Sequence, residues 1–269
     1  MRFVIQLCIV LAGLLTWHSA SAQEASASDL AKAAQNPIAS LISVPIQSNI
    51  DFDWGPNSDT FAVTNIQPVL PFKLNDDWNL VTRTILPIVD QNDVPFSGVS
   101  EFGLADTVQS FFFSPKAPSA NGWIWGVGPA LLLPTATDEV LGAEKWGIGP
   151  TAVALKQQGP WTFGGLANHI ESIAGDSDRG DVNQSLIQPF VNYNLPNGWY
   201  LVSSPIINAN WEADSSETWT LPVGGGFGKI FRIGRQPVNA QIQAFYNVET
   251  PDSGADWQLR LQWHFLFPK

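Results

Sequence analysis

The feature that most constrains the fold of this chain is a regular succession of extended segments. From about residue 43, twelve stretches rich in Val, Ile, Phe, Trp and Thr are separated by clusters of Asn, Asp, Gly and Pro. Their expected limits are 43–53, 60–72, 77–88, 104–114, 122–133, 146–157, 160–171, 183–194, 198–209, 218–231, 236–248 and 255–268. Single-chain bacterial barrels have an even number of strands. The pattern therefore predicts an all-β fold, a transmembrane antiparallel β-barrel of about twelve strands.

The last segment indicates which face of each strand meets which surroundings. Two series of residues alternate along this segment. The apolar series is Trp257, Leu259, Leu261, Trp263, Phe265 and Phe267. The mostly polar series is Gln258, Arg260, Gln262, His264 and Leu266. Successive side chains of a strand point to opposite faces, so this alternation predicts apolar residues toward lipid and polar residues toward a lumen. The aromatic end resembles the signal that the barrel-assembly machinery reads, although Pro268 and Lys269 follow it.

The composition favours a membrane barrel over a soluble domain. Charged residues make up 14% of the chain, against about 25% in a typical soluble protein. After residue 22 no apolar run approaches the roughly 20 residues of a spanning helix, so the apolar surface must lie in a large core or on a closed sheet in lipid. The net charge of −11 argues against nucleic-acid binding.

The first 22 residues have the layout of a secretory signal peptide. Arg2 precedes an apolar run over residues 3–15, and a small-residue site ends at Ala22. We expect cleavage before Gln23 and export across the inner membrane to the outer membrane. Cys8 is the only cysteine, so its removal would exclude disulfides, thiol catalysis and cysteine-ligated metals. No cofactor is expected.

Residues 23–42 differ from the rest of the mature chain. The stretch from Asp29 to Gln35 is helix-prone, and Pro37 follows as a terminator. We expect a short N-terminal helix, either in the periplasm or plugging the lumen, with the barrel occupying residues 43–269.

The links between segments alternate in length. Links after even-numbered segments are mostly short, whereas links after odd-numbered segments are longer and carry most of the 24 acidic residues. This alternation is typical of a periplasmic and an extracellular rim. Tryptophans stand at both ends of the segments, which predicts two interfacial aromatic girdles: Trp78, Trp123, Trp161 and Trp199 at the short links, and Trp54, Trp146, Trp211, Trp219 and Trp257 at the long ones.

Glycines recur on the faces predicted to point inward: Gly126, Gly128, Gly147, Gly149, Gly164, Gly224, Gly226 and Gly228. A symmetric hairpin would place Gly128 opposite Gly147 and Gly126 opposite Gly149. Such a smooth wall could leave room for a solute or for the N-terminal helix. Equally, the glycines could be bends that let the sheet curve.

Polar residues supply the lumen-lining candidates: Asn65, Gln67, Asn79, Arg83, Asn168, Gln188, Asn192, Asn239, Gln241, Gln243, Arg260, Gln262 and His264. An interior of amides with few cations suits small polar or weakly anionic solutes. The same side chains could instead bond to one another and fill the barrel, as in eight-stranded examples.

Catalytic and metal-binding signals are weak. Only His169 and His264 would remain after cleavage, on distant segments, so no metal site is predicted. The stretch from Gly175 to Asp181 departs from a calcium loop because no Glu closes it. Outer-membrane phospholipase is also a twelve-stranded barrel, but its His-x-Ser-Asn-Gly signature is missing after His169. We therefore predict that the protein is not an enzyme, with a lipid hydrolase as the enzymatic alternative.

Five segments resemble a known family: AKAAQNPIASLISVP (31–45), DWNLVTRTILPI (77–88), LLPTATDEVLG (132–142), KWGIGPTAVAL (145–155) and GKIFRIGRQPVNAQIQAFYNVE (228–249). They are similar to bacterial outer-membrane transporters related to the phenol-degradation MetA-pathway family, some of which carry the misnomer neuromedin U. The resemblance spans nearly the whole mature chain and implies an outer-membrane barrel. It supplies neither a substrate nor catalytic residues.

Three hypotheses follow. The first is a passive channel for small solutes, including aromatic or hydrophobic compounds, with membrane lipid and the assembly machinery as its other partners. The second is a structural or adhesive barrel whose acidic loops bind cations. The third is the lipid hydrolase.

Overall fold

The computed structural model describes residues 27–55, 59–92, 98 and 100–268. The predicted signal peptide, residues 1–22, lies outside the described residues. So do residues 23–26 of the predicted N-terminal segment.

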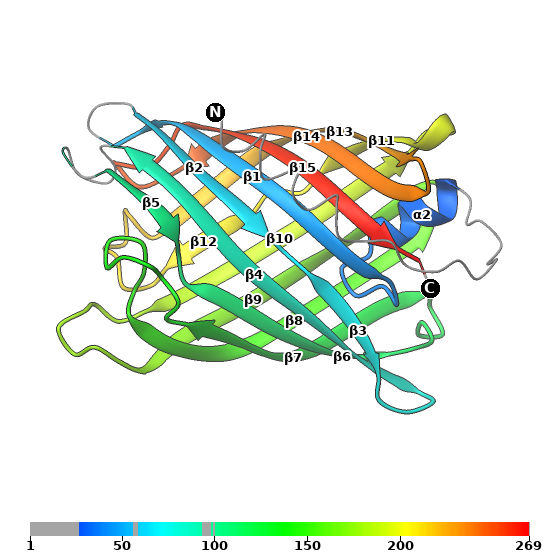
Figure 1. Ribbon diagram of the computed structural model, residues 1–269, viewed down its shortest axis with the longest axis horizontal. Coiled ribbons are helices and arrows are strands. Elements are labelled where there is room, and N and C mark those ends of the chain that lie inside the picture. Colours follow the sequence, from blue (N-terminus) through cyan, green and yellow to red (C-terminus); the bar gives the residue numbers. More distant parts are fainter. Residues whose placement is uncertain (1–26, 56–58, 93–97, 99, 269) are drawn as a thin grey trace.

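The chain forms one antiparallel sheet that closes into a barrel, because the last strand pairs with the first (Figure 1). The strands are β1 (Ile42–Trp54), β2 (Asp59–Ile66), β3 (Val69–Lys73), β4 (Trp78–Asn92), β5 (Ser100–Leu104), β6 (Thr107–Pro115), β7 (Trp123–Leu133), β8 (Lys145–Gln158), β9 (Trp161–Gly175), β10 (Asn183–Asn194), β11 (Trp199–Ser203), β12 (Ile207–Asn210), β13 (Trp219–Ile233), β14 (Gln236–Glu249) and β15 (Trp257–Phe267). A short helix, α2 (Ala27–Ala34), and a 3-10 turn, η2 (Pro196–Gly198), complete the described elements.

Three pairs of strands, β2 with β3, β5 with β6, and β11 with β12, are consecutive pieces of one crossing segment. The wall therefore consists of twelve crossing segments, and the predicted twelve-stranded barrel is confirmed. Each of the three interruptions is two or three residues long. The register continues unchanged from β2 to β3 and from β11 to β12. Between β5 and β6 it shifts by one residue relative to β4, so even-numbered residues face outward in β5 and inward in β6.

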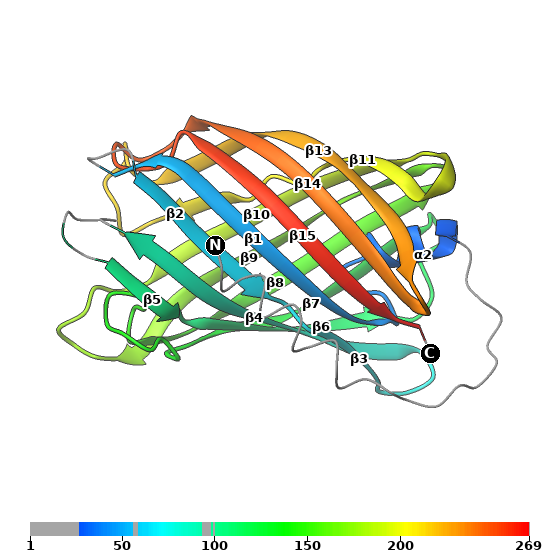
Figure 2. The same ribbon diagram turned by 45° about the horizontal axis from the view of Figure 1, so that its top comes forward.

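Turn chemistry explains the short links. The side chain of Asn75 accepts hydrogen bonds from the backbone nitrogens of Asp77 and Trp78, at 2.9 and 2.8 Å, before β4 starts. In η2, Asn197 and Gly198 both adopt positive φ angles, 61° and 76°, as a tight turn between antiparallel strands requires. These short links lie at one end of the barrel, with α2 and the C-terminal end of β15, and the longer loops lie at the other end (Figures 1 and 2).

The outer surface is apolar along the strands. Val127, Ile148, Leu201 and Phe227 are all exposed, and each alternates with buried or half-buried inward neighbours. A monomeric soluble protein rarely shows so continuous an apolar surface, whereas a lipid-facing band requires it. No helix among the described residues is long and apolar enough to cross a membrane.

Tryptophans begin β4, β7, β9 and β11 at the short-link end and lie at strand ends at the other, as the sequence predicted. Several stack on aromatic neighbours across the sheet, such as Trp123 on Phe163 and Trp161 on Tyr193, with ring centroids 5.9 and 4.7 Å apart. Their place at membrane interfaces stays a prediction.

The predicted register of β7 and β8 is wrong. Gly126 pairs with Val153, and Gly149 pairs with Ala130, so each glycine meets a residue four positions from the expected partner. The prediction treated the link as a symmetric turn. Instead the link folds aside, because the hydroxyl groups of Thr135 and Thr137 accept hydrogen bonds from the β5–β6 region, at 2.9 and 3.0 Å. An even shift keeps every side chain on its face, so the glycines still point inward.

Candidate channel interior

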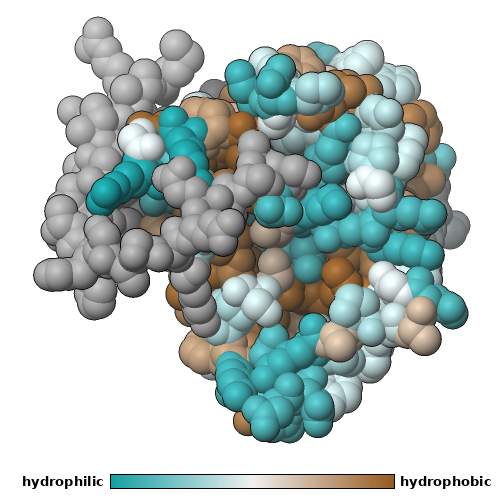
Figure 3. Space-filling view, turned by 90° about the vertical axis from the view of Figure 1, so that its right-hand side faces the viewer, coloured by the Kyte–Doolittle hydropathy of each residue, from teal (hydrophilic) through white to brown (hydrophobic). Residues whose placement is uncertain are grey.

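The N-terminal segment enters the short-link end of the barrel. Leu30 and Ala31 of α2 are buried against inward side chains of β11, β13 and β15, among them Tyr200, Ile230 and Leu266. Seen from this end in Figure 3, hydrophobic residues are visible between hydrophilic ones at the centre of the rim. Residues 27–41, the described part of the predicted segment before β1, therefore pack against inward side chains at this opening. That the segment plugs the lumen stays a prediction.

Polar contacts hold the segment in place. The side chains of Gln35 and Asn194 exchange two hydrogen bonds, at 2.9 and 3.2 Å. The amide of Gln157 donates to the carbonyl oxygen of Lys32, at 2.8 Å. Contacts on two different strands fix both the depth and the direction of the segment.

A cavity of about 130 Å³ lies next to the segment, and residues 34–37 form part of its lining. Eight of the predicted lumen residues line it: Gln67, Arg83, Gln188, Asn192, Asn239, Gln241, Gln262 and His264. Cavities of roughly 150 Å³ admit a benzene ring, so this space suits a solute of about one aromatic ring.

One side of the interior is a network of amides and cations. The Arg83 guanidinium donates to Gln67 Oε1, at 2.7 Å. The Tyr200 hydroxyl lies 2.6 Å from Asn239 Oδ1. His264 is buried in the cavity wall, and its Nε2 atom has no hydrogen-bond partner among the described residues.

The remaining five predicted lumen residues also lie at inward register positions but outside the cavity lining. Asn65 pairs with Gln47, Asn168 with Thr151, and Asn79 bonds to Ser40. Gln243 and Arg260 are fully engaged with protein groups and bind Ser204. Whether any of the thirteen contacts a solute stays a prediction.

The opposite side of the interior is apolar, which the sequence reasoning missed. Ile38 packs against a cluster from β3, β4, β6, β8 and β9 that includes Val81, Phe112, Leu155 and Leu166. A second cluster, Ala130, Leu132 and Ile170, lies farther along β7 and β9 toward the long loops. Both were recognisable as positions in step with the inward glycines.

Other protein atoms occupy the space next to the inward-facing glycines. A Cβ atom on Gly126 would lie 3.3 Å from Ile38 Cδ1, and one on Gly228 would enter the ring of Tyr200. At these two positions glycine makes room for a protein side chain, and at Gly126 that side chain belongs to the N-terminal segment. Gly128, Gly147, Gly149, Gly164, Gly224 and Gly226 lie on the same inward faces, where substituents would meet neighbouring backbone or side-chain atoms.

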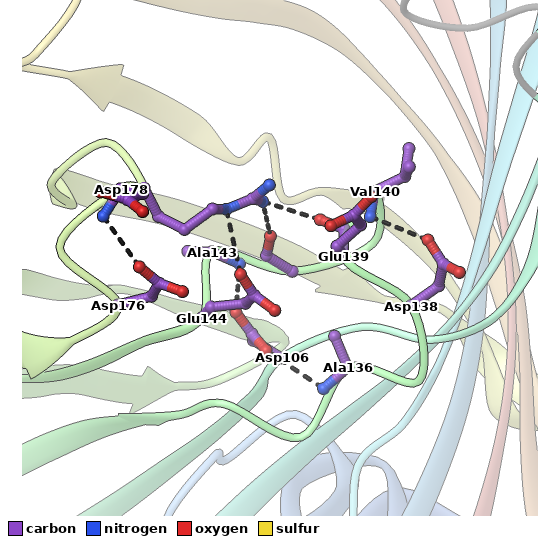
Figure 4. Close-up of polar contacts among 11 residues, drawn as sticks. Asp106, Ala136, Asp138, Glu139, Val140, Ala143, Glu144, Asp176 and Asp178 are labelled. Carbon is purple, nitrogen blue, oxygen red and sulfur yellow. Dashed lines mark hydrogen bonds and ion pairs between the residues drawn. The ribbon is translucent and has the colours of Figure 1, made fainter.

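At the long-loop rim, an acidic recess of about 330 Å³ lies between Asp106 and the β7–β8 loop, with Asp138, Glu139 and Glu144 in its lining. Figure 4 shows how the loop is held: Asp106 accepts hydrogen bonds from the backbone nitrogens of Ala136 and Ala143, at 3.2 and 2.7 Å. In the described part of the chain, no three His, Cys, Asp or Glu side chains are close enough to hold a metal ion. Cation binding by the acidic loops stays a hypothesis.

No protein-family model matches this chain, and no curated protein matches it. Among solved structures, it is similar to an outer membrane channel from Pseudomonas putida F1, with a TM-score of 0.63, 17% identity, and coverage of 93% of this chain and 100% of that one. The chain has the fold of an outer-membrane β-barrel channel. Outer membrane phospholipase A from Escherichia coli matches with a TM-score of 0.45, 14% identity, and coverage of 91% and 99%. CdiB from Acinetobacter baumannii matches with a TM-score of 0.37, 11% identity, and coverage of 84% and 60%. These last two scores are too low to support an argument.

Proposed function

We propose that this protein is a passive channel in the bacterial outer membrane for small solutes. The observation that carries the proposal is the cavity of about 130 Å³ inside a closed barrel whose outer surface is apolar. Residues 34–37 narrow the lumen on the short-link side without filling this cavity. The predicted signal peptide, the aromatic girdles and assembly by the barrel-insertion machinery belong to the same proposal.

The two-sided interior favours amphipathic solutes of about one aromatic ring. Val69, Leu166 and Phe190 offer apolar surface in the cavity wall, while Arg83 and Gln262 offer polar groups on the other side. A ring that carries a hydroxyl or carboxylate group would satisfy both. The relation to the phenol-degradation MetA-pathway family agrees with such solutes and stays a prediction.

Conductance in planar lipid bilayers tests the channel. A variant with Cys8→Ser, Gln35→Cys and Asn194→Cys, bridged by a short bifunctional thiol reagent that contains a disulfide, would fix the N-terminal segment to β10. We expect steady current through the wild-type protein, a fall in current on bridging, and recovery after reduction. The two single-cysteine variants serve as controls and should not respond. The absence of a steady current through bilayers that contain the wild-type protein would contradict the channel proposal.

A second candidate function rests on one contact that the sequence did not predict. On the outward face near the long loops, His169 Nδ1 lies 2.9 Å from Ser185 Oγ, and His169 Nε2 lies 3.1 Å from Glu171 Oε1. Serine, histidine and carboxylate in this order are the groups of a nucleophilic hydrolase. Trp211 Nε1 also donates to Ser185 Oγ, at 2.9 Å, so the groups satisfy one another without any chemistry. Phospholipid hydrolysis that is lost in Ser185→Ala and retained in Ser172→Ala would support this candidate.

A further inference from the structure

Of the three strand interruptions in the described chain, one lacks a bridging backbone hydrogen bond. The other two interruptions are bridged: Gln67 N donates to Pro45 O at 2.8 Å, and Ala105 N donates to Pro87 O at 3.0 Å. Between β11 and β12, in contrast, no backbone hydrogen bond joins residues 204–206 to the flanking strands, all of which lie within the described chain. We call this gap, bounded by β10, β13 and residues 204–206, the slot.

Proline explains the slot. The register is the same on both sides, since Val191 pairs with Ser203 and Ile187 pairs with Ile207. Continued through the gap, this register would place Pro189 opposite Pro205. Neither residue has an N–H group, so neither can form the missing rung. The paired residues on the two sides of the gap are four positions apart along each segment, which is about 13 Å at roughly 3.3 Å per residue. This distance is the length of the slot.

Side chains replace the missing bonds from the inside of the barrel. The backbone nitrogen of Ser204 donates to Gln243 Oε1 at 3.0 Å, and the carbonyl oxygen of Ser204 accepts from Arg260 Nη1 at 2.7 Å. Gln243 and Arg260 are 0% and 1% exposed. Irregular backbone at membrane depth persists only where protein or a cavity satisfies its polar groups. Inward side chains therefore satisfy the backbone groups of Ser204, and the slot is a stable part of the folded wall.

A space adjoins the slot on each side. Inside, Gln188, Phe190, Val202 and Ser204 belong to the lining of the lumen cavity. Outside, an apolar groove of about 360 Å³ is lined by Trp161, Val191, Tyr193, Leu201, Val202 and Ser203. Val202 takes part in both linings, so this residue separates the cavity from the groove.

The depth of the slot fits passage into lipid. Pro205 stands six residues from Trp199, at the short-link end. At roughly 3.3 Å per residue and a tilt of about 40°, this is about 15 Å along the membrane normal, near the middle of an apolar band about 25 Å tall. The groove runs from there toward the short-link rim, beside the exposed side chain of Leu201.

We propose that the slot is a lateral exit through which small apolar ring compounds pass from the lumen cavity into the membrane, leaving along the outer groove. This inference rests on the proposed channel function. It adds a route on which an apolar solute avoids the N-terminal segment, whereas ions and polar solutes must pass that segment.

Uptake of radiolabelled toluene by Gram-negative host cells, together with ion conductance of the purified protein, tests the exit. Leu201→Trp should fill the groove from the lipid side without reaching the lumen. Leu261→Trp, at an outward position on β15 far along the sheet from the slot, is the matched control. We expect Leu201→Trp to reduce uptake to that of cells without the protein while conductance stays unchanged, and Leu261→Trp to change neither. Wild-type uptake in a folded Leu201→Trp barrel would overturn the exit.

A second variant tests the cause of the gap. Pro189→Ala combined with Pro205→Ala restores two N–H donors and should close the rung. We expect loss of toluene uptake with normal conductance, whereas unchanged uptake would contradict the role assigned to the prolines. Wild-type protein that conducts ions but admits no toluene would overturn the exit and leave the channel standing. Wild-type protein that does neither would overturn both.

Discussion

Ile38 Cδ1 occupies the space above Gly126, at 3.3 Å from the position of the absent Cβ atom. Ile38 belongs to the N-terminal segment and is 4% exposed, whereas Gly126 belongs to the wall on β7. The missing side chain on β7 is therefore part of what seats the segment inside the barrel.

Gly126→Leu should displace Ile38 and loosen the N-terminal segment. Loss of a buried isoleucine contact costs about 2–5 kcal/mol, enough to shift the segment out of its seat. We expect faster proteolysis within residues 27–41 and higher ion conductance than in the wild-type protein. Val127→Leu, the outward neighbour, is the control and should behave like wild type. An unchanged protease pattern in Gly126→Leu would show that the contact does not hold the segment.

Arg260→Ala should destabilise the whole barrel. Its guanidinium donates to Asn49 Oδ1, Ser204 O and Gln258 Oε1, at 2.9, 2.7 and 2.9 Å, and lies 4.8 Å from the ring of Phe245. Each buried acceptor left without a donor costs about 1–3 kcal/mol, so we expect a loss of about 3 kcal/mol or more in urea unfolding from lipid vesicles.

Lys73→Ala is the control for that measurement. Lys73 pairs with Asp76 on the surface, and an exposed ion pair contributes only about 0–1 kcal/mol. Equal effects of the two substitutions would show that Arg260 is not an organising residue of the wall.

The β7–β8 loop should open when the contacts of Asp106 or those of Arg179 are removed. Asp106 holds it from the link between β5 and β6, and Arg179 donates from the β9–β10 loop to the carbonyl oxygens of Glu139 and Gly142. We expect Asp106→Ala and Arg179→Ala to speed proteolysis between residues 134 and 144 without lowering barrel stability. Asp178→Ala keeps both anchors and is the matched control. Equal rates of cleavage in all three variants would show that Asp106 and Arg179 do not hold the loop.

Asp181 should titrate below ordinary aspartates. Hydrogen bonds from Lys145 and Ser172, at 3.1 and 3.2 Å, lower the pKa of this loop carboxyl group. Because the pKa is lower in the folded protein, the contribution of the contact is complete above the ordinary value of about 3.9 and is lost as the pH falls through the lowered value. NMR titration should show the pKa rising toward the ordinary value in Lys145→Met. An identical titration in both proteins would contradict the assignment.

The sequence by itself determined the number of crossing segments, their faces and the polarity of the two rims. These properties follow from a period of two residues and from turn chemistry, both of which are local. His264 and Arg260 lie at alternate positions of β15 for this reason. The polar half of the interior was accessible in the same way.

The tertiary structure decided what depends on contacts between distant segments. The pairing of Gly126 with Val153 depends on a loop bound to another hairpin, and the seat of Ile38 depends on five strands. The slot forms where Pro189 of β10 would lie opposite Pro205, which lies between β11 and β12. Such juxtapositions depend on the register between two paired segments, which no single segment carries.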